Sequence, residues 1–313
     1  MRHLIPEEAP VRLERSILFV PAFNWRMIEK AVTLPADAIC LDLEDSVAPD
    51  QKATARANVI RAFSQLDFKG RLRIFRTNGL ETPFAYRDLI EIVEALVDQV
   101  DLVMVPKVGS PHDVLFVAKL LTQIEMHCHS KKRIGIEAQI ESASGFLSAR
   151  EIAEASPRLD SLVFGPGDYA ASMQMPSSGI GEFDEWDESC RGHRCDTVMH
   201  TIVAAARANG LRCLDGPIAD YHDSGKFEKS CRIARAMGFD GKQCIHPTQL
   251  AAANAVFAPS ANEAAFAERV IQAYDHVLSK GLGAASLEGK MIDAATVRVA
   301  RVVAQKYRLS QSR

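Results

Sequence analysis

The chain has 313 residues, a formal net charge of −3 and 47% hydrophobic residues, the balance of an ordinary globular protein. This composition excludes a disordered chain, a collagen and a small disulfide scaffold. A near-neutral chain also gives no electrostatic reason to expect nucleic-acid binding. No apolar run approaches the ~20 residues of a membrane helix, and the charged residues 1–14 lack the apolar core of a signal peptide. We therefore expect a protein that binds neither nucleic acid nor a membrane. Its seven cysteines, odd in number and spread over residues 40–244, indicate reduced thiols and a cytoplasmic location.

Short β-rich runs alternate with helical patterns along the first 250 residues. The predicted strands span residues 16–21, 38–45, 71–78, 101–107, 133–141, 159–168, 212–217 and 242–246. The predicted helices span residues 26–33, 51–66, 86–97, 111–126, 145–155, 197–209, 226–237 and 249–254. Continuous apolar strands that alternate with helices indicate a parallel sheet covered on its outer face. Eight such units predict an α/β fold, a (β/α)₈ TIM barrel; a doubly wound open sheet is the alternative.

The pattern changes in the last quarter of the chain. A long helix is predicted over residues 262–279, with Ser260 as its N-cap. A flexible glycine-containing stretch and a final helix over residues 295–306 follow, without a ninth strand unit. We predict a catalytic barrel over residues 1–250 and a C-terminal helical extension over residues 251–313. The extension either packs on a neighbouring subunit or covers the site.

Charged and polar residues collect where the predicted strands end, which is the rim that carries the active site in TIM barrels. The fifth strand is the most informative, because Glu137, Gln139 and Glu141 alternate with apolar residues and so share one face. The outer face must be apolar to meet helices, so these three side chains are expected to face the barrel interior or its mouth. Carboxylates are costly there unless they are paired or bind a metal.

A hard cation is one explanation for these carboxylates. Glu141 and Asp168 end adjacent strands and could share Mg²⁺, which takes one or two carboxylates together with water and substrate oxygens. A nearby arginine would then help to hold a chelating 2-oxo acid. A purely structural ion-pair network with Arg76 and Lys107 is the alternative. Lys107 could also be a Schiff-base lysine, although a charge-pairing role is favoured.

Several stretches, taken together, resemble the HpcH/HpaI aldolase and citrate lyase β-subunit (CitE-like) superfamily, and most of all its malyl-CoA lyases. The resemblance runs from residue 15 to about residue 302, and its order and spacing are highly specific. The stretches are LDLEDSVAPD (41–50), RTNGLETPF (76–84), VPKVGSPHDV (105–114), EAQIESASG (137–145), SPRLDSLVFGPGDYAASM (156–173), GFDGKQCIHPTQ (238–249), VFAPS (256–260) and the segment 283–293.

The resemblance implies a TIM barrel whose helical extension reaches a neighbour in a homotrimer or homohexamer. It implies reversible Claisen cleavage of a 3-hydroxyacyl-CoA such as malyl-CoA, methylmalyl-CoA or citramalyl-CoA. The products would be acetyl-CoA or propionyl-CoA and glyoxylate or pyruvate. The cofactor would be Mg²⁺, with Mn²⁺ as a substitute, and the partners would be a CoA thioester and a 2-oxo acid. The residues implied are Glu141 and Asp168 for the metal; Arg76, Asp293, Glu44 and Asp45 for catalysis; and Phe19, Arg26 and Lys30 for coenzyme A.

Other functions stay open. The same site could hydrolyse malyl-CoA as a thioesterase, or combine condensation with hydrolysis as a malate synthase. The chain could act on a carrier-bound citryl thioester like a citrate lyase β subunit, or could bind ligand without catalysis. Taken alone, Asp293 reads as the N-cap of the final helix and His246 as a hydrogen-bonded core histidine. The loop over residues 176–195 is expected to border the acyl or oxo-acid pocket.

Overall fold

The computed structural model describes residues 12–176, 178–181, 184–190 and 193–311. These residues form two compact units, one containing Glu14–Asn254 and the other containing Ala255 onward together with residues 12–13. The boundary falls after Asn254, within helix α11 (Leu250–Phe257). Most of the segment 1–14, for which no signal peptide is predicted, lies outside the described residues. Across the described chain, no helix has the length and apolarity that crossing a membrane requires.

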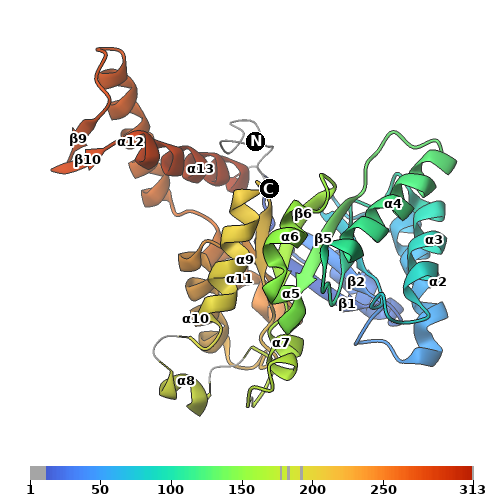
Figure 1. Ribbon diagram of the computed structural model, residues 1–313. Helices are drawn as coiled ribbons and strands as arrows, with labels where there is room; N and C mark the ends of the chain where they lie inside the picture. The colour runs from blue at the N-terminus through green and yellow to red at the C-terminus, as the bar shows by residue number, and fades with distance from the viewer. Residues whose placement is uncertain (1–11, 177, 182–183, 191–192, 312–313) are drawn as a thin grey trace. The chain divides into compact units, whose positions relative to one another are not determined.

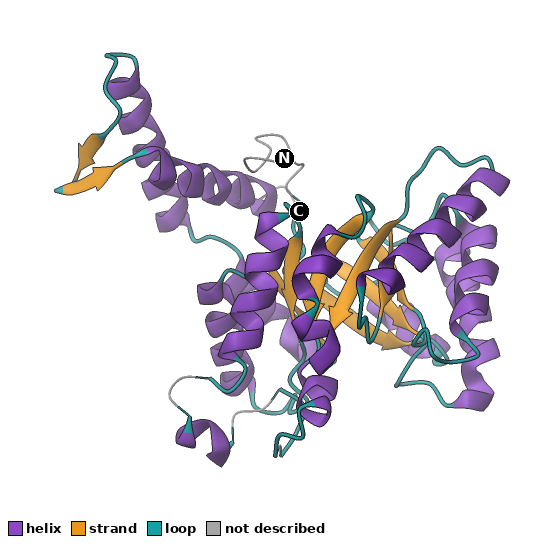
Figure 2. Ribbon diagram, viewed as in Figure 1, coloured by secondary structure: helices purple, strands orange, loops and turns teal. Residues whose placement is uncertain are grey.

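The first unit is a closed barrel of eight parallel strands in sequence order, which confirms the predicted TIM barrel (Figures 1 and 2). Each strand pairs with the next, and β1 also pairs with β8. The strands are β1 (Ser16–Pro21), β2 (Ala38–Asp42), β3 (Leu72–Arg76), β4 (Leu102–Val105), β5 (Gly135–Ile140), β6 (Leu159–Phe164), β7 (Arg212–Asp215) and β8 (Gly241–Cys244).

Helices connect consecutive strands along the chain and cover the outside of the barrel (Figure 2). Their apolar faces are buried; α3, for example, buries Leu89, Ile92, Val93 and Leu96. The helices are α1 (Trp25–Ala31), α2 (Lys52–Gln65), α3 (Ala85–Leu96), α4 (Pro111–His127), α5 (Ala143–Leu147), α6 (Ala149–Glu154), α7 (Pro166–Ser172), α8 (Glu185–Ser189), α9 (Asp196–Ala208) and α10 (Ser224–Met237), with short 3₁₀ turns at Pro49–Gln51 and Pro247–Gln249.

The barrel interior is apolar in its body and polar at the carboxyl ends of the strands. Side chains of alternate residues point inward, and those of six strands form a buried apolar cluster: Ile17, Ala38, Cys40, Ile74, Leu102, Met104, Val163 and Leu214. The next inward position on β2 is Asp42 and on β3 is Arg76. The β2–β3 register pairs these two residues directly. The apolar layer therefore supports a charged layer at one rim.

The structure differs most clearly from the prediction at two elements. The helix predicted over residues 145–155 is two short helices, α5 and α6, that meet at Ser148. Serine and glycine, which α5 contains, are poor helix formers. The strand predicted over residues 159–168 ends at Phe164, and α7 begins at Pro166. Proline has no N–H to donate to a strand ladder but fits the first turn of a helix, so the chain changes direction there.

The second unit packs two helices, α12 (Ala261–Leu278) and α13 (Ala294–Gln311), through a small apolar core formed by Ala267, Val270, Ile292, Val297, Ala300 and Ala304. Ser260 caps α12 by accepting a hydrogen bond from Glu263 N, as predicted. The stretch predicted to be flexible contains a β-hairpin, β9 (Ala285–Leu287) and β10 (Lys290–Ile292). Its turn residues Glu288 and Gly289 both have positive φ, as a two-residue type I′ turn requires.

Candidate active site

A cleft of about 370 Å³ opens at the carboxyl ends of the barrel strands. Five of the predicted site residues line it: Phe19, Asp45, Arg76, Glu141 and Asp168. Strand ends of a parallel barrel converge on one rim, which explains how residues so distant in sequence meet. The other lining residues are Val20, Pro21, Met27, Asp42, Ser46, Gln139, Gly165, Pro166, Gly167, Ile180, Pro217, Gln243 and Ile245.

Arg76 is the buried cation of the cleft; Asp42 fixes its guanidinium group with two hydrogen bonds, and Glu44 lies beside it in an ion pair. Its Nε and Nη2 donate to the two oxygens of Asp42, over 2.7 and 2.9 Å, and its Nη1 lies 3.0 Å from Glu44 Oε2. The guanidinium carbon also lies 5.2 Å from the centre of the Phe19 ring. Burial disfavours the charge, but the two carboxylates outweigh burial and keep the pKa of Arg76 well above its ordinary value. Arg76 is therefore a charged, preorganised donor.

Asp42 connects this arginine to the turn that follows β2. Its Oδ1 also accepts from Glu44 N over 3.0 Å, and its Oδ2 accepts from Ser46 Oγ over 2.6 Å. Burial raises the pKa of Asp42, but the charge and hydrogen bonds of Arg76 and the bond from Ser46 bring the net pKa below its ordinary value. Asp42 lies within the predicted strand 38–45 and was given no role there. The inward alternation along β2 was the signal that could have identified it.

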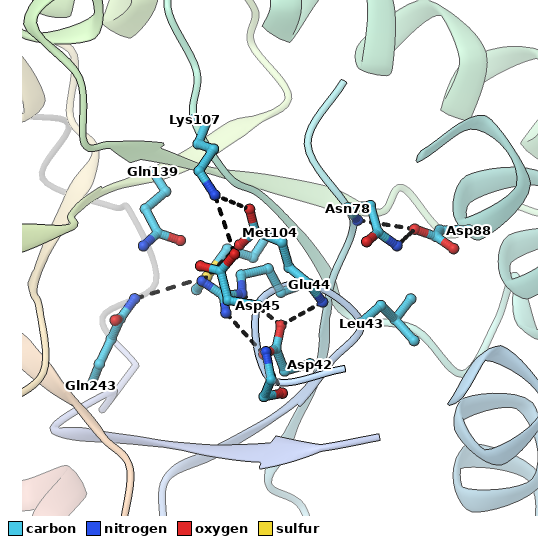
Figure 3. Close-up of polar contacts among 12 residues, drawn as sticks. Asp42, Leu43, Glu44, Asp45, Asn78, Asp88, Met104, Lys107, Gln139 and Gln243 are labelled. Atoms are coloured by element: carbon cyan, nitrogen blue, oxygen red, sulfur yellow. Dashed lines mark hydrogen bonds and ion pairs between the residues drawn. The ribbon is translucent and has the colours of Figure 1, made fainter. Parts of the chain in front are cut away.

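Lys107 follows β4 and joins the acidic residues of the cleft (Figure 3). Its Nζ lies 2.6 Å from Glu44 Oε1 and 3.3 Å from Asp45 Oδ1. Glu44 does not line the main cleft; it lines a neighbouring cavity of about 410 Å³, as do Asp45 and Lys107. Burial lowers the pKa of Lys107, but the Glu44 carboxylate outweighs it and raises the net pKa well above its ordinary value. A charged amine is not nucleophilic, so this environment favours charge pairing over a Schiff base.

Glu141 and Asp168 place carboxylate oxygens in the cleft. Glu141 is buried; its Oε1 accepts from Lys107 N over 2.7 Å, and its Oε2 accepts from the Gln139 side-chain amide over 2.7 Å. Burial, with repulsion from Glu44 and Asp168, raises the pKa of Glu141 to about 8. Asp168, in the first turn of α7, has a 42% exposed side chain.

The donors at this place fit a hard divalent cation. They are carboxylate oxygens, one buried and one open to solvent, as Mg²⁺ prefers when it also binds water and substrate. Among the described residues, Gln139 Oε1 is buried without a hydrogen-bond partner, so a further polar atom faces the same region. A buried carboxylate whose pKa is raised is also one that a cation would stabilise.

Glu137 belongs to a different part of the barrel. Its Oε1 accepts from Ser161 Oγ over 2.9 Å, and oxygens of Glu14, Glu137 and Asp160 lie within 4.8 Å of one another. Arg212 pairs with both Glu14 and Asp160. Glu137 precedes Glu141 by four residues, or roughly 13 Å along a strand, so this acidic group is separate from the cleft. The prediction that the polar face of β5 points into the barrel is confirmed. Gln139 and Glu141 line the cleft, whereas Glu137 lies in the separate group with Glu14 and Asp160.

Four of the residues considered at the sequence level stand apart from these contacts. Arg26 and Lys30 are exposed on α1, and Met27 of the same helix lines the cleft. Asp293 is in the second unit, where its Oδ1 accepts from Thr296 N and Oγ1 and so caps α13. His246 is half-buried rather than in the core. Its Nδ1 lies 2.9 Å from Thr248 Oγ1, and its ring stacks on Tyr221 at 4.4 Å.

Several residues that line the cleft were not predicted from the sequence, including Met27, Pro217, Gln243 and Ile245. The alternation of Gly241, Gln243 and Ile245 along β8 could have identified two of them. The loop over residues 176–195 contributes Ile180, in agreement with the expectation that this loop borders the pocket. Residues 177, 182–183 and 191–192 of that loop lie outside the described residues.

Comparison with known proteins places these features in a family. Residues 15–247 match the HpcH/HpaI aldolase/citrate lyase family. An L-malyl-CoA/β-methylmalyl-CoA lyase of Rhodobacter capsulatus is 39% identical over 97% of both chains. A (3S)-malyl-CoA thioesterase of Cereibacter sphaeroides is 36% identical over 92% of both. The crystal structure of CitE from Mycobacterium tuberculosis in complex with magnesium, acetoacetate and coenzyme A is 29% identical and superposes with a TM-score of 0.72, covering 93% of this chain and 97% of the other. The chain therefore belongs to the HpcH/HpaI aldolase/citrate lyase family.

Proposed function

We propose that this protein is a Mg²⁺-dependent carbon–carbon lyase acting on a 3-hydroxyacyl-CoA of the malyl-CoA, methylmalyl-CoA or citramalyl-CoA type. The products are acetyl-CoA or propionyl-CoA and glyoxylate or pyruvate. The observation that carries the proposal is the presence of Arg76, Glu141 and Asp168 in one cleft. The lyase and the thioesterase named above, whose names both include malyl-CoA, support this substrate class.

Glu141 and Asp168 would hold the cation, with Mn²⁺ as a substitute for Mg²⁺. When bound, the cation supplies Lewis-acid stabilisation of the alkoxide and of the oxo-acid carbonyl. Glu44 and Asp45 lie beside these ligands and would accept hydrogen bonds from water at the metal. Arg76 would bind the oxo-acid carboxylate, because its guanidinium is charged and held in place by Asp42.

Cleavage breaks the bond between C2 and C3 of the acyl chain. The 3-hydroxyl gives its proton to water in the cleft, and its oxygen becomes the carbonyl of the oxo acid. The bonding electrons pass to a thioester enolate, which takes up one proton, so the protons balance overall. Charge on the reacting oxygen develops beside Arg76, whose donors need no reorganisation. An acid near the acyl carbon completes the reaction; we assign this role to Asp293 of a neighbouring subunit.

The assignment of Asp293 requires an oligomer, and we propose a homotrimer or homohexamer in the cytoplasm. Residues 1–250 would form the catalytic barrel, and residues 251–313 would form an extension that reaches the neighbouring site. In this chain Asp293 caps α13 through Oδ1, and the same carboxyl group would carry the proton.

Coenzyme A would bind at the side of the cleft formed by β1 and α1. Phe19 lines the cleft and offers an apolar ring. Arg26 and Lys30 are four residues apart on the exposed face of α1, so both charges are on one side of the helix, where a phosphate-bearing tail could reach them.

The condensation direction tests this function. Purified protein with Mg²⁺, acetyl-CoA and glyoxylate should form a hydroxyacyl-CoA that mass spectrometry identifies; propionyl-CoA and pyruvate test the related substrates. Free malate with free CoA would instead favour the thioesterase or malate synthase alternative, which the 36% identical thioesterase supports. No product from any pair, with turnover of a carrier-bound citryl thioester, would favour a citrate lyase β-subunit function.

A further inference from the structure

Lys107 has an unusual backbone conformation at the rim of the cleft. Its φ is 53°, in the left-handed region that a lysine rarely occupies. Such strain persists where the surrounding contacts fix it, and it is concentrated at functional sites. In this conformation the Lys107 N–H donates to Glu141 Oε1 over 2.7 Å, and the side chain reaches Glu44 Oε1 over 2.6 Å. Lys107 thus contacts Glu141 through its backbone and Glu44 through its side chain.

The side chain of Lys107 continues into a chain of ion pairs that ends at Arg76. Lys107 Nζ binds one oxygen of Glu44, and the other oxygen of Glu44 lies 3.0 Å from Arg76 Nη1. Asp42 holds the opposite edge of the same guanidinium group. Glu44 is buried, so without the Lys107 ammonium it would keep one carboxylate oxygen without a strong donor. Lys107, Glu44 and Arg76 thus form one connected series of ion pairs.

The ammonium group of Lys107 also places a positive charge next to the carboxylates that face the cation. Its Nζ lies 3.8 Å from Asp168 Oδ1 and 3.3 Å from Asp45 Oδ1. A charge at this distance repels a divalent cation bound to Asp168. The same side chain thus supports the arginine and weakens cation binding, which are effects of opposite sign.

We propose that Lys107 is a positioning residue: it orients Arg76 through Glu44 and, at the same time, lowers the affinity of the cleft for Mg²⁺. This inference rests on the proposed function, because it assumes that Glu141 and Asp168 hold the metal and that Arg76 binds the oxo acid. A side chain that merely stabilised the fold would shift metal affinity and turnover in the same direction.

The test compares Lys107→Met with the wild-type protein and with Lys132→Met. Lys132 has a matched ion pair, with its Nζ 2.7 Å from Asp101 Oδ1, outside the cleft. Isothermal titration with Mg²⁺ alone should show about three- to tenfold tighter binding to Lys107→Met, the size expected for loss of one screened charge. Its kcat should fall about 100-fold, and the KM for the oxo acid should rise, as for a displaced reacting group. Lys132→Met should match the wild type in both.

Two further variants separate the side chain from the backbone. Lys107→Gly adopts positive φ without strain and keeps the N–H to Glu141, so it should behave like Lys107→Met. Lys107→Arg should recover part of the turnover. Weaker Mg²⁺ binding by Lys107→Met, or a kcat within threefold of the wild type, would overturn the proposal. The Mg²⁺ titration needs no turnover, so a wild-type protein that cleaves no thioester would refute the proposed function while still testing the charge effect.

Discussion

Gly165 and Glu141 are so close that no other residue fits at position 165. A Cβ built on Gly165 would overlap the Oε2 atom of Glu141 and lie 2.5 Å from its Cβ. Gly165 follows β6 and Glu141 follows the neighbouring strand β5. The end of β6 therefore leaves space for the Glu141 carboxylate. The position of the buried Glu141 carboxylate therefore depends on the absence of a side chain at Gly165.

Gly165→Ala should displace Glu141. We expect Mg²⁺ affinity to fall at least about tenfold and stability to fall by about 1–3 kcal/mol, because the added methyl overpacks a filled space. Titration calorimetry and thermal melting measure the two effects. Gly225→Ala, in the first turn of α10 where the Cβ meets an atom only at 3.4 Å, is the control and should lose neither. Unchanged Mg²⁺ binding in Gly165→Ala would show that Glu141 is not a ligand.

Glu141→Gln should abolish Mg²⁺ binding and raise the stability of the metal-free protein. The amide keeps an oxygen for Lys107 N but removes a carboxyl group whose ionisation burial disfavours, as its pKa of about 8 shows. We expect the metal-free variant to be more stable than the wild type by about 1–3 kcal/mol, and Mg²⁺ no longer to raise its melting temperature. Melts with and without Mg²⁺ measure both quantities. A variant that keeps Mg²⁺-dependent turnover would contradict the metal assignment.

Asp42→Asn should lower the free energy of unfolding by an amount that depends on pH, because it breaks the ion pair with Arg76. The pKa of Asp42 is lowered in the folded protein, so its charge stabilises the fold above the unfolded pKa, near about 4, and this contribution is lost as the pH falls through the folded pKa. Removing one partner of a buried pair costs about 3–5 kcal/mol. Denaturant titrations should show this difference at pH 7 and a smaller one in acid. A difference that grows in acid would contradict the assignment.

Two substitutions distinguish capping by Asp293 from catalysis. Asparagine is also a good N-cap, so Asp293→Asn should melt like the wild type but lose turnover. Asp293→Ala should lose both, because Thr296 N would have no acceptor. Oxo-acid binding should persist in both variants. Wild-type turnover by Asp293→Asn would leave Asp293 with its capping role alone.

The barrel and much of the site could be predicted because they follow from periodicity. Alternation along β5 put Glu141 on the inner face, and the strand ends placed Arg76 and Asp168 at the same rim. Periodicity could not predict two other features, because both depend on three-dimensional packing. They are the space that Gly165 leaves for Glu141 and the positive φ of Lys107. The hairpin at Glu288–Gly289 was missed because glycine in a polar stretch fits both a flexible linker and a tight turn.

The most direct test of the account is product analysis in the cleavage direction. Malyl-CoA, methylmalyl-CoA and citramalyl-CoA would each be incubated with the protein and Mg²⁺, with and without EDTA, and all products identified by mass spectrometry. The account predicts EDTA-sensitive release of acetyl-CoA or propionyl-CoA together with glyoxylate or pyruvate. Free CoA with an intact hydroxy acid, or cleavage that EDTA leaves unchanged, would contradict it.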